Sequence, residues 1–108
     1  MQVPAQIDDA DVVAFVKLDP TIHHDTGACR MFADGVRQTY FHGLAIATYD
    51  LDSFYLFFCD AQWETENDLF HDSVAEAMKD ALRMYCVAKS HWTFLFEDLR
   101  PIGNAAAE

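Results

Sequence analysis

Apolar residues in the first half of the chain gather in short runs separated by turn-forming residues, a pattern typical of β-strands. Asp34 and Gly35 suit the tight turn of a hairpin, and Gly43 marks a point where a longer strand would break in two. The run FYLFFC is apolar on both faces, so we expect it to form a central strand of a sheet. The pattern predicts strands over residues 12–18, 29–33, 36–49 and 54–59.

The second half of the chain carries the spacing of an amphipathic helix over residues 73–86, followed by that of a strand. Ser73 and Glu76 have the spacing of a capping box, in which each side chain bonds a backbone N–H at the helix start. Residues 91–97 alternate aromatic with other side chains, which predicts a final strand. The helical stripe that we expect to be buried comprises Val74, Ala77, Met78, Ala81, Leu82 and Tyr85.

These elements predict a single small α+β domain over residues 1–108. We expect an antiparallel β-meander of roughly four to five strands that packs against the one main helix and is completed by the final strand. Residues 101–108 carry little apolar material, so we expect a flexible tail there.

The ends of the chain and its cysteines indicate where the protein works. No apolar run approaches the ~20 residues of a membrane-spanning helix, and the N-terminus lacks the pattern of a signal peptide. We therefore expect no membrane association and a cytoplasmic location. Cys29, Cys59 and Cys86 are an odd set without C-x-x-C spacing, which predicts reduced thiols. We expect Cys59 and Cys86 to pack as small apolar side chains.

The distribution of charge is more informative than its sum of −11, which arises from 18 acids and 7 bases. Eight acids and no lysine or arginine stand between Arg37 and Lys79, and Tyr49, Trp63 and Phe70 are interleaved with them. Such a segment repels nucleic-acid phosphates, whereas a basic protein partner would relieve the crowding of like charges. The residues that we predict to bind this partner are Asp60, Trp63, Glu64, Glu66, Asp68 and Asp72.

A solvated loop is the alternative interpretation of the same segment. Its acids would then face water without a partner, and its aromatic side chains would dock on the core. Trp63 fits either interpretation, as an anchor in an interface or as an anchor in the core.

Candidates for chemistry elsewhere in the chain have less specific patterns. The side chains of His23, His24, Asp25 and Cys29 suit a transition metal, but they lack a recurrent ligand spacing, so metal binding stays open. The acidic segment lacks the turn glycine and the closing glutamate of a calcium loop. A nucleophilic Cys59 would need an electropositive setting, and Asp60 is its neighbour. We therefore expect no catalytic residue and no cofactor, and we assign no residue as a metal ligand.

Residues 54–85 contain an aromatic strand, a polar loop and the helix sequence HDSVAEAMKDALRMY. This stretch resembles small bacterial immunity and antitoxin proteins, including the HicB-like antitoxin domain. In those proteins a strand pair leads through a loop into a capped helix that begins S/T-x-x-E-A, and Ser73, Glu76 and Ala77 match that start. The resemblance implies an α+β binding protein, and it assigns no functional residue.

Two functions are consistent with the sequence. The first is a non-catalytic acidic binding protein, an immunity-like or antitoxin-like inhibitor of a basic enzyme such as a nuclease. The second is a small enzyme or ligand-binding domain, with a pocket between sheet and helix lined by Phe54, Phe58, Tyr85 and Trp92. An exposed edge strand also leaves a homo-oligomer open.

Overall fold

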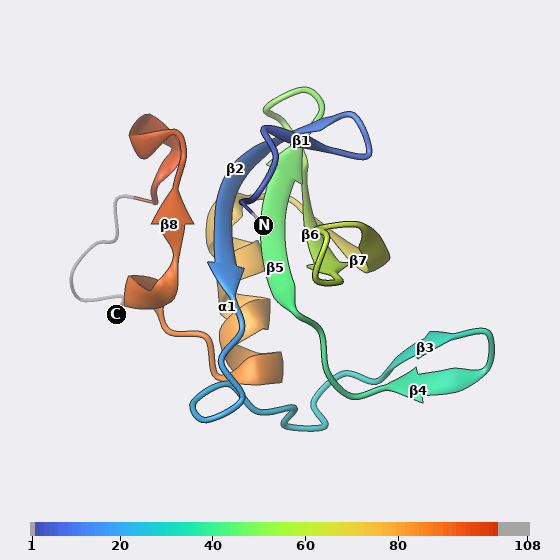
Figure 1. Ribbon diagram of the computed structural model, residues 1–108. Helices are drawn as coiled ribbons and strands as arrows, with labels where there is room; N and C mark the ends of the chain where they lie inside the picture. Colours follow the sequence, from blue (N-terminus) through green and yellow to red (C-terminus); the bar gives the residue numbers. More distant parts are fainter. Residues whose placement is uncertain (1, 102–108) are drawn as a thin grey trace.

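A six-stranded antiparallel sheet forms the centre of the computed structural model, which describes residues 2–101 (Figure 1). The strand order is β1-β2-β5-β6-β7, and β8 also pairs with β2. The sheet strands are β1 (Gln6–Ile7), β2 (Ala10–Lys17), β5 (Gly43–Thr48), β6 (Phe54–Cys59), β7 (Thr65–His71) and β8 (Thr93–Phe94). A separate hairpin comprises β3 (Met31–Ala33) and β4 (Val36–Gln38). With the helix α1 (Val74–Tyr85) on one face of the sheet, the predicted α+β class is confirmed.

Several local predictions agree with the structure. The strand FYLFFC lies between β5 and β7, so its central position is confirmed. Asp34 and Gly35 turn the β3–β4 hairpin with φ of 51° and 79°, the left-handed conformation that such a turn needs. The long run over residues 36–49 is two strands, and the break precedes Gly43, because residues 39–42 carry the chain from the hairpin to β5.

The helix begins where the sequence predicts, since the Ser73 hydroxyl accepts a hydrogen bond of 3.1 Å from the Glu76 backbone N–H. One predicted core position is wrong: Leu82 is 52% exposed, and Met84 is buried instead. At about 100° per residue these two side chains lie on opposite flanks of the apolar stripe, and only the Met84 flank is covered.

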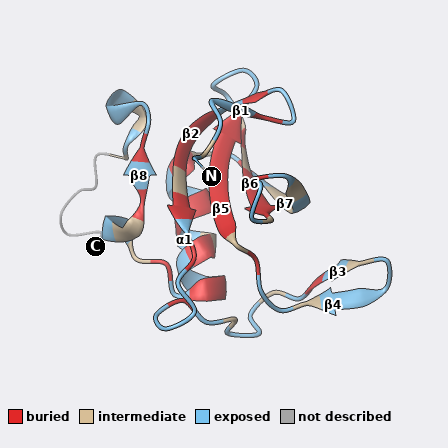
Figure 2. Cartoon of the chain, viewed as in Figure 1, coloured by how far each residue is buried: buried red, intermediate tan, exposed pale blue. Residues whose placement is uncertain are grey.

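The sheet is buried on both faces near its centre (Figure 2). The face toward α1 carries the larger apolar cluster, in which the rings of Phe41, Phe58 and Tyr85 contact one another. The opposite face carries a smaller cluster built around Phe57, Cys59 and Trp63. Because both faces of β5 are covered, each of its six residues is buried.

The acid-rich segment differs most from its prediction. Residues 65–71 were expected within a loop, and they form β7, which pairs with β6 along its length. Glu66, Asp68 and Phe70 are exposed and alternate with half-buried residues, as the period of a strand requires. The signal is faint in the sequence because Asn67 and Leu69 are the only half-buried residues between these three exposed positions.

Three smaller predictions are corrected or untested. The final strand expected over residues 91–97 is confined to β8, and Phe96 beyond it is exposed. Cys86 is exposed rather than packed, because it ends α1 in the left-handed conformation with φ of 63°. Apart from Pro101, the tail expected over residues 101–108 lies outside the described residues.

No helix of the described part is long and apolar enough to span a bilayer.

Candidate functional site

The face of the sheet turned away from α1 brings acidic and aromatic side chains together. In the register of β6 with β7, Tyr55 lies opposite Phe70 and Phe57 lies opposite Asp68. Phe57 belongs to the apolar cluster on this face, and alternate residues of a strand point the same way, so Asp68 and Phe70 project from it as well. We call this surface the acidic face; it comprises Asp8, Asp9, Tyr49, Tyr55, Glu66, Asp68 and Phe70.

Three aromatic rings form a row across the acidic face. Tyr55 is the middle ring, with centroid distances of 5.8 Å to Tyr49 and 5.6 Å to Phe70. Both outer rings stand nearly perpendicular to Tyr55, at interplanar angles of 79° and 75°. Tyr49 and Phe70 are each 56% exposed, so the row presents apolar area to solvent. The row therefore offers stacking surfaces that the fold itself leaves open.

Acids from distant parts of the sequence surround this row. Asp8 and Asp9 form the turn between β1 and β2, and the Tyr49 hydroxyl donates a 2.7 Å hydrogen bond to the Asp8 carbonyl. Figure 1 shows this turn and the turn after β5 at the same end of the sheet. Burial, followed by the charge of Asp8 and then by Tyr55, Asp9 and Asp68, raises the pKa of Tyr49. The two turn acids and Asp68 of β7 therefore lie near the same tyrosine.

The turn acids stand in an uncommon backbone conformation. Asp8 and Asp9 have φ of 50° and 67°, values that favour Asn-Gly in a two-residue hairpin turn. Two carboxylates here cost conformational stability and add like charge beside β7.

No ion pair within residues 2–101 involves an acid of the acidic face. Within residues 2–101, arginine and lysine form ion pairs away from the face, among them Arg37–Asp25, Lys79–Glu76, Arg83–Asp80 and Arg100–Glu97.

The residues predicted from the sequence fall into two groups. Glu66 and Asp68 lie on the acidic face, whereas Glu64 and Asp72 are exposed at either end of β7. Asp60 shapes its own loop, because its carboxylate accepts 2.9 Å hydrogen bonds from the backbone N–H groups of Gln62 and Glu64.

Trp63 has the role of a core anchor in the free protein. It is 4% exposed, its ring meets Phe15 edge to face at 5.8 Å, and it covers Gly43 so closely that a Cβ there would collide with the indole. Its φ of 62° is unusual for a bulky residue, and burial of the indole offsets that strain.

The sequence interpretation did not include Asp8, Asp9 and Tyr55. The signal for the turn was present, since two acids separate Ile7 from the apolar run that begins at Ala10. Their proximity to β7 depends on how the sheet curls, which has no local signature in the sequence.

The cysteines and histidines outside the acidic face were the other candidates for chemistry. Burial, and then the charges of Asp60, Asp8 and Glu66, raise the pKa of Cys59 to about 12, so it is a neutral thiol at physiological pH. His23 is buried, with its Nε2 3.0 Å from Nδ1 of His91. Asp25 pairs with Arg37, and no group of three or more potential ligands within residues 2–101 is placed to hold a metal. Within the His23–Cys29 segment, His23 and Asp25 are thus engaged in contacts with other side chains of the protein.

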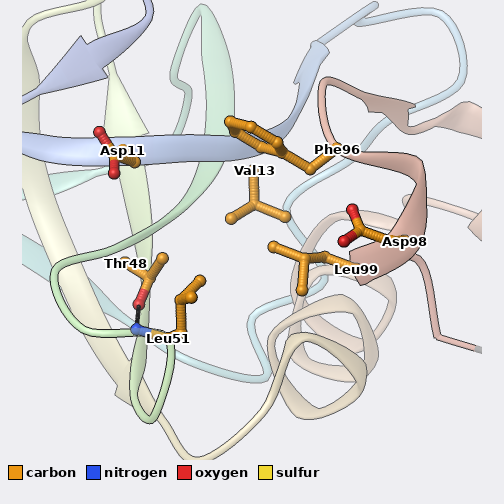
Figure 3. Close-up of a pocket in the computed structure, with 7 residues that line it drawn as sticks. All are labelled: Asp11, Val13, Thr48, Leu51, Phe96, Asp98 and Leu99. Atoms are coloured by element: carbon orange, nitrogen blue, oxygen red, sulfur yellow. Dashed lines mark hydrogen bonds between the residues drawn. The ribbon is translucent and has the colours of Figure 1, made fainter.

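The hollows of the surface lie away from the aromatic core. Phe58 and Tyr85 contact Phe41 and fill the space between sheet and helix. A hollow of about 240 Å³ lies instead between the ends of β2 and β5 and residues 96–99, where Asp11 and Asp98 stand at opposite sides of apolar lining (Figure 3). Its volume is below the roughly 300–1,000 Å³ of small-molecule sites. A second, open groove of about 770 Å³ runs beside α1 and residues 87–90.

No protein-family model matches this sequence, and neither a curated protein nor a solved structure is significantly similar to it.

Proposed function

We propose that this chain is a non-catalytic binding protein that takes up a basic protein partner on its acidic face. One observation carries the proposal: acids from the β1–β2 turn and from β7 surround exposed aromatic rings, and none of these acids has an ion pair within the described residues. Unpaired charge of one sign speeds encounter with a partner of the other sign. Exposed aromatic rings then provide the area that gives affinity.

The mode of action that fits this surface is occlusion. A basic enzyme such as a nuclease would lose access to its anionic substrate when the acidic face covers its basic residues, as an immunity or antitoxin protein would achieve. Nucleic acid itself is excluded as a partner by the charge of the face. We place the protein in the cytoplasm, where its three free thiols, Cys29, Cys59 and Cys86, would remain reduced.

Charge reversal on the face tests the proposal. Tagged protein is used to capture partners from extracts of its own cells at about 50 mM and about 500 mM NaCl, because salt screens exposed charges. The variant E66K/D68K should lose a partner that the wild type captures at low salt. A matched variant, D52K/D98K, changes two exposed acids outside the acidic face by the same total charge and should keep that partner.

Equal capture by the wild type, the face variant and the matched variant would overturn the proposal. The same holds if the captured partner is acidic, or if the contact resists high salt and maps by amide exchange to another surface. Circular dichroism checks that the variants are folded, and substitutions at such exposed positions normally change stability by only about 0.5 kcal/mol.

A further inference from the structure

We infer that the acidic face selects arginine over lysine, so that the segment it binds is arginine-rich. This inference rests on the proposed function and specifies the chemistry of the partner. Both side chains satisfy a carboxylate, but only the planar guanidinium of arginine also stacks on an aromatic ring. The face offers the two kinds of group side by side.

The spacing on β7 suits a guanidinium. Asp68 and Phe70 are two residues apart on one face of a strand, which separates their Cα atoms by about 7 Å. A guanidinium that lies flat on the Phe70 ring can therefore point its edge N–H groups at the Asp68 carboxylate. A lysine ammonium reaches the carboxylate equally well, but it has no flat surface to lay against the ring.

The aromatic row extends this arrangement along a bound chain. Tyr49 is as exposed as Phe70, and its ring is held by the 2.7 Å hydrogen bond from its hydroxyl to Asp8. Asp8 and Asp9 stand beside Tyr49 as Asp68 stands beside Phe70. The face thus presents two rings, each with acids nearby, on either side of Tyr55. Two arginines of one segment would occupy these two positions.

Strand addition is the other way in which a peptide binds a sheet, and the hairpin opposes it here. The Asn67 side-chain amide donates hydrogen bonds of 3.1 Å to the Phe32 carbonyl and 3.2 Å to the Gln38 side-chain oxygen. The β3–β4 hairpin therefore contacts β7, the terminal strand of the sheet and the one at which an added strand would pair. Recognition is left to the side chains of the acidic face.

Two synthetic peptides of equal length, one of alternating glycine and arginine and one of alternating glycine and lysine, test the inference on the whole chain. Each is titrated into isotope-labelled protein at about 50 mM NaCl, and the amide shifts give both the affinity and the surface contacted. For each ring on which a guanidinium stacks, the arginine peptide should bind about two- to fivefold more tightly, since a cation–π contact at an exposed site contributes about 0.5–1 kcal/mol. The largest shifts should lie in β7 and in the β1–β2 turn.

Two substitutions of Phe70 and one matched control separate the ring from its surroundings. F70A and F70L should both reduce the preference for the arginine peptide, leaving only the part that the Tyr49 ring contributes, and F70L does so while retaining an apolar side chain. F32A is the control, because Phe32 is 55% exposed on the hairpin and has no place on the acidic face. D68N should weaken both peptides, because both use the carboxylate.

The outcomes distinguish the two proposals. Equal affinity for both peptides, with shifts on the acidic face, overturns arginine selection and leaves the proposed function standing. Loss of the arginine preference in F32A as well as in F70L also overturns the selection. If E66K/D68K weakens the two peptides no more than D52K/D98K does, the acidic face is not the binding surface and both proposals fail.

Discussion

Trp63 shows how one residue can have a different role from the one its sequence surroundings indicate. It lies among acids in the sequence, which makes it a candidate for an interface, yet it is 4% exposed and covers Gly43. A single sequence gives no sign of this contact, because Gly43 and Trp63 are twenty residues apart. Gly43 makes the contact possible only because it has no side chain.

Gly43→Ala should therefore disturb Trp63. The added methyl collides with the indole, and overpacking of this kind costs about 1–3 kcal/mol of the free energy of unfolding. Urea unfolding followed by tryptophan fluorescence measures the cost, and the emission should shift to the red as the indole gains solvent. In a W63L background the same Gly43→Ala change should cost much less; an equal cost in both backgrounds would locate the clash elsewhere.

Cys86 is a second residue whose place in the structure is set by the backbone conformation rather than by side-chain packing. Its φ is 63°, and its N–H bonds to the Ala81 and Leu82 carbonyls close the last turn of α1. Glycine adopts this conformation without steric cost, so Cys86→Gly should raise the free energy of unfolding by about 1 kcal/mol. Cys86→Ala is the control, because it removes the thiol and keeps the Cβ. A gain of equal size in both variants would show that the thiol, rather than the backbone, limits stability.

At the scale of elements, the sequence predicts those that carry a strong period. FYLFFC and the helix start at Ser73 were placed correctly because apolar runs and capping residues are local signals. The strand β7 was missed because its exposed face carries Glu66, Asp68 and Phe70, and its other face carries few apolar residues. The sequence still indicates Glu66 and Asp68 as candidates, because a run of acids without a lysine or arginine is visible whether the segment is a loop or a strand. The sequence does not predict that Asp8 and Asp9 join this site, because the curl of the sheet is what brings the β1–β2 turn close to it.

The β1–β2 turn gives a prediction at this scale. Replacement of Asp8 and Asp9 by Asn and Gly supplies the residues that a left-handed two-residue turn favours, and it removes two like charges. D8N/D9G should raise the free energy of unfolding by about 1 kcal/mol, as measured in urea. The gain should persist at high salt, where repulsion is screened, if the backbone is its cause. A gain that disappears in salt would assign it to charge.

At the scale of the whole molecule, His23 and His91 join two distant segments. The His23 Nδ1 accepts a 2.9 Å hydrogen bond from the Asp19 N–H, so its proton sits on Nε2, which donates to His91 Nδ1. His91 Nδ1 also accepts from the Ala88 N–H at 3.0 Å. The neutral pair thereby ties the loop after β2 to the turn that precedes Trp92 and β8.

This pair makes stability depend on pH. Burial, followed by the charge of His91, lowers the pKa of His23 below its ordinary value of 6.5, with His24 adding to the effect and Asp19 opposing it. The unfolded chain therefore takes up this proton first on acidification. The stabilisation is complete above pH 6.5 and is lost as the pH falls toward the lower pKa of the folded state.

Urea midpoints between about pH 7.5 and about pH 5 should show this loss, with a slope of at most about 1.4 kcal/mol per pH unit for one group. H23N keeps an acceptor for the Asp19 N–H and should flatten the profile. H24N removes the exposed neighbouring histidine and should leave the slope close to that of the wild type. Equal slopes in H23N and the wild type would show that other groups cause the dependence. The carboxylates of Asp19, Asp50, Asp80 and Glu97, whose pKa values are lowered, act at more acidic pH.

The pairing of β2 has a consequence for how the chain is made. This early strand bonds β5 on one side. On the other side its first two residues pair with β1, whereas Ala14 and Phe15 pair with β8, which lies about eighty residues further along. During synthesis, this later part of the β2 edge therefore has no partner until residues 93–94 have emerged. That interval is when a nascent molecule is most exposed to pairing with its neighbours. Its strong net negative charge, which keeps like chains apart, then has a second use before any partner arrives.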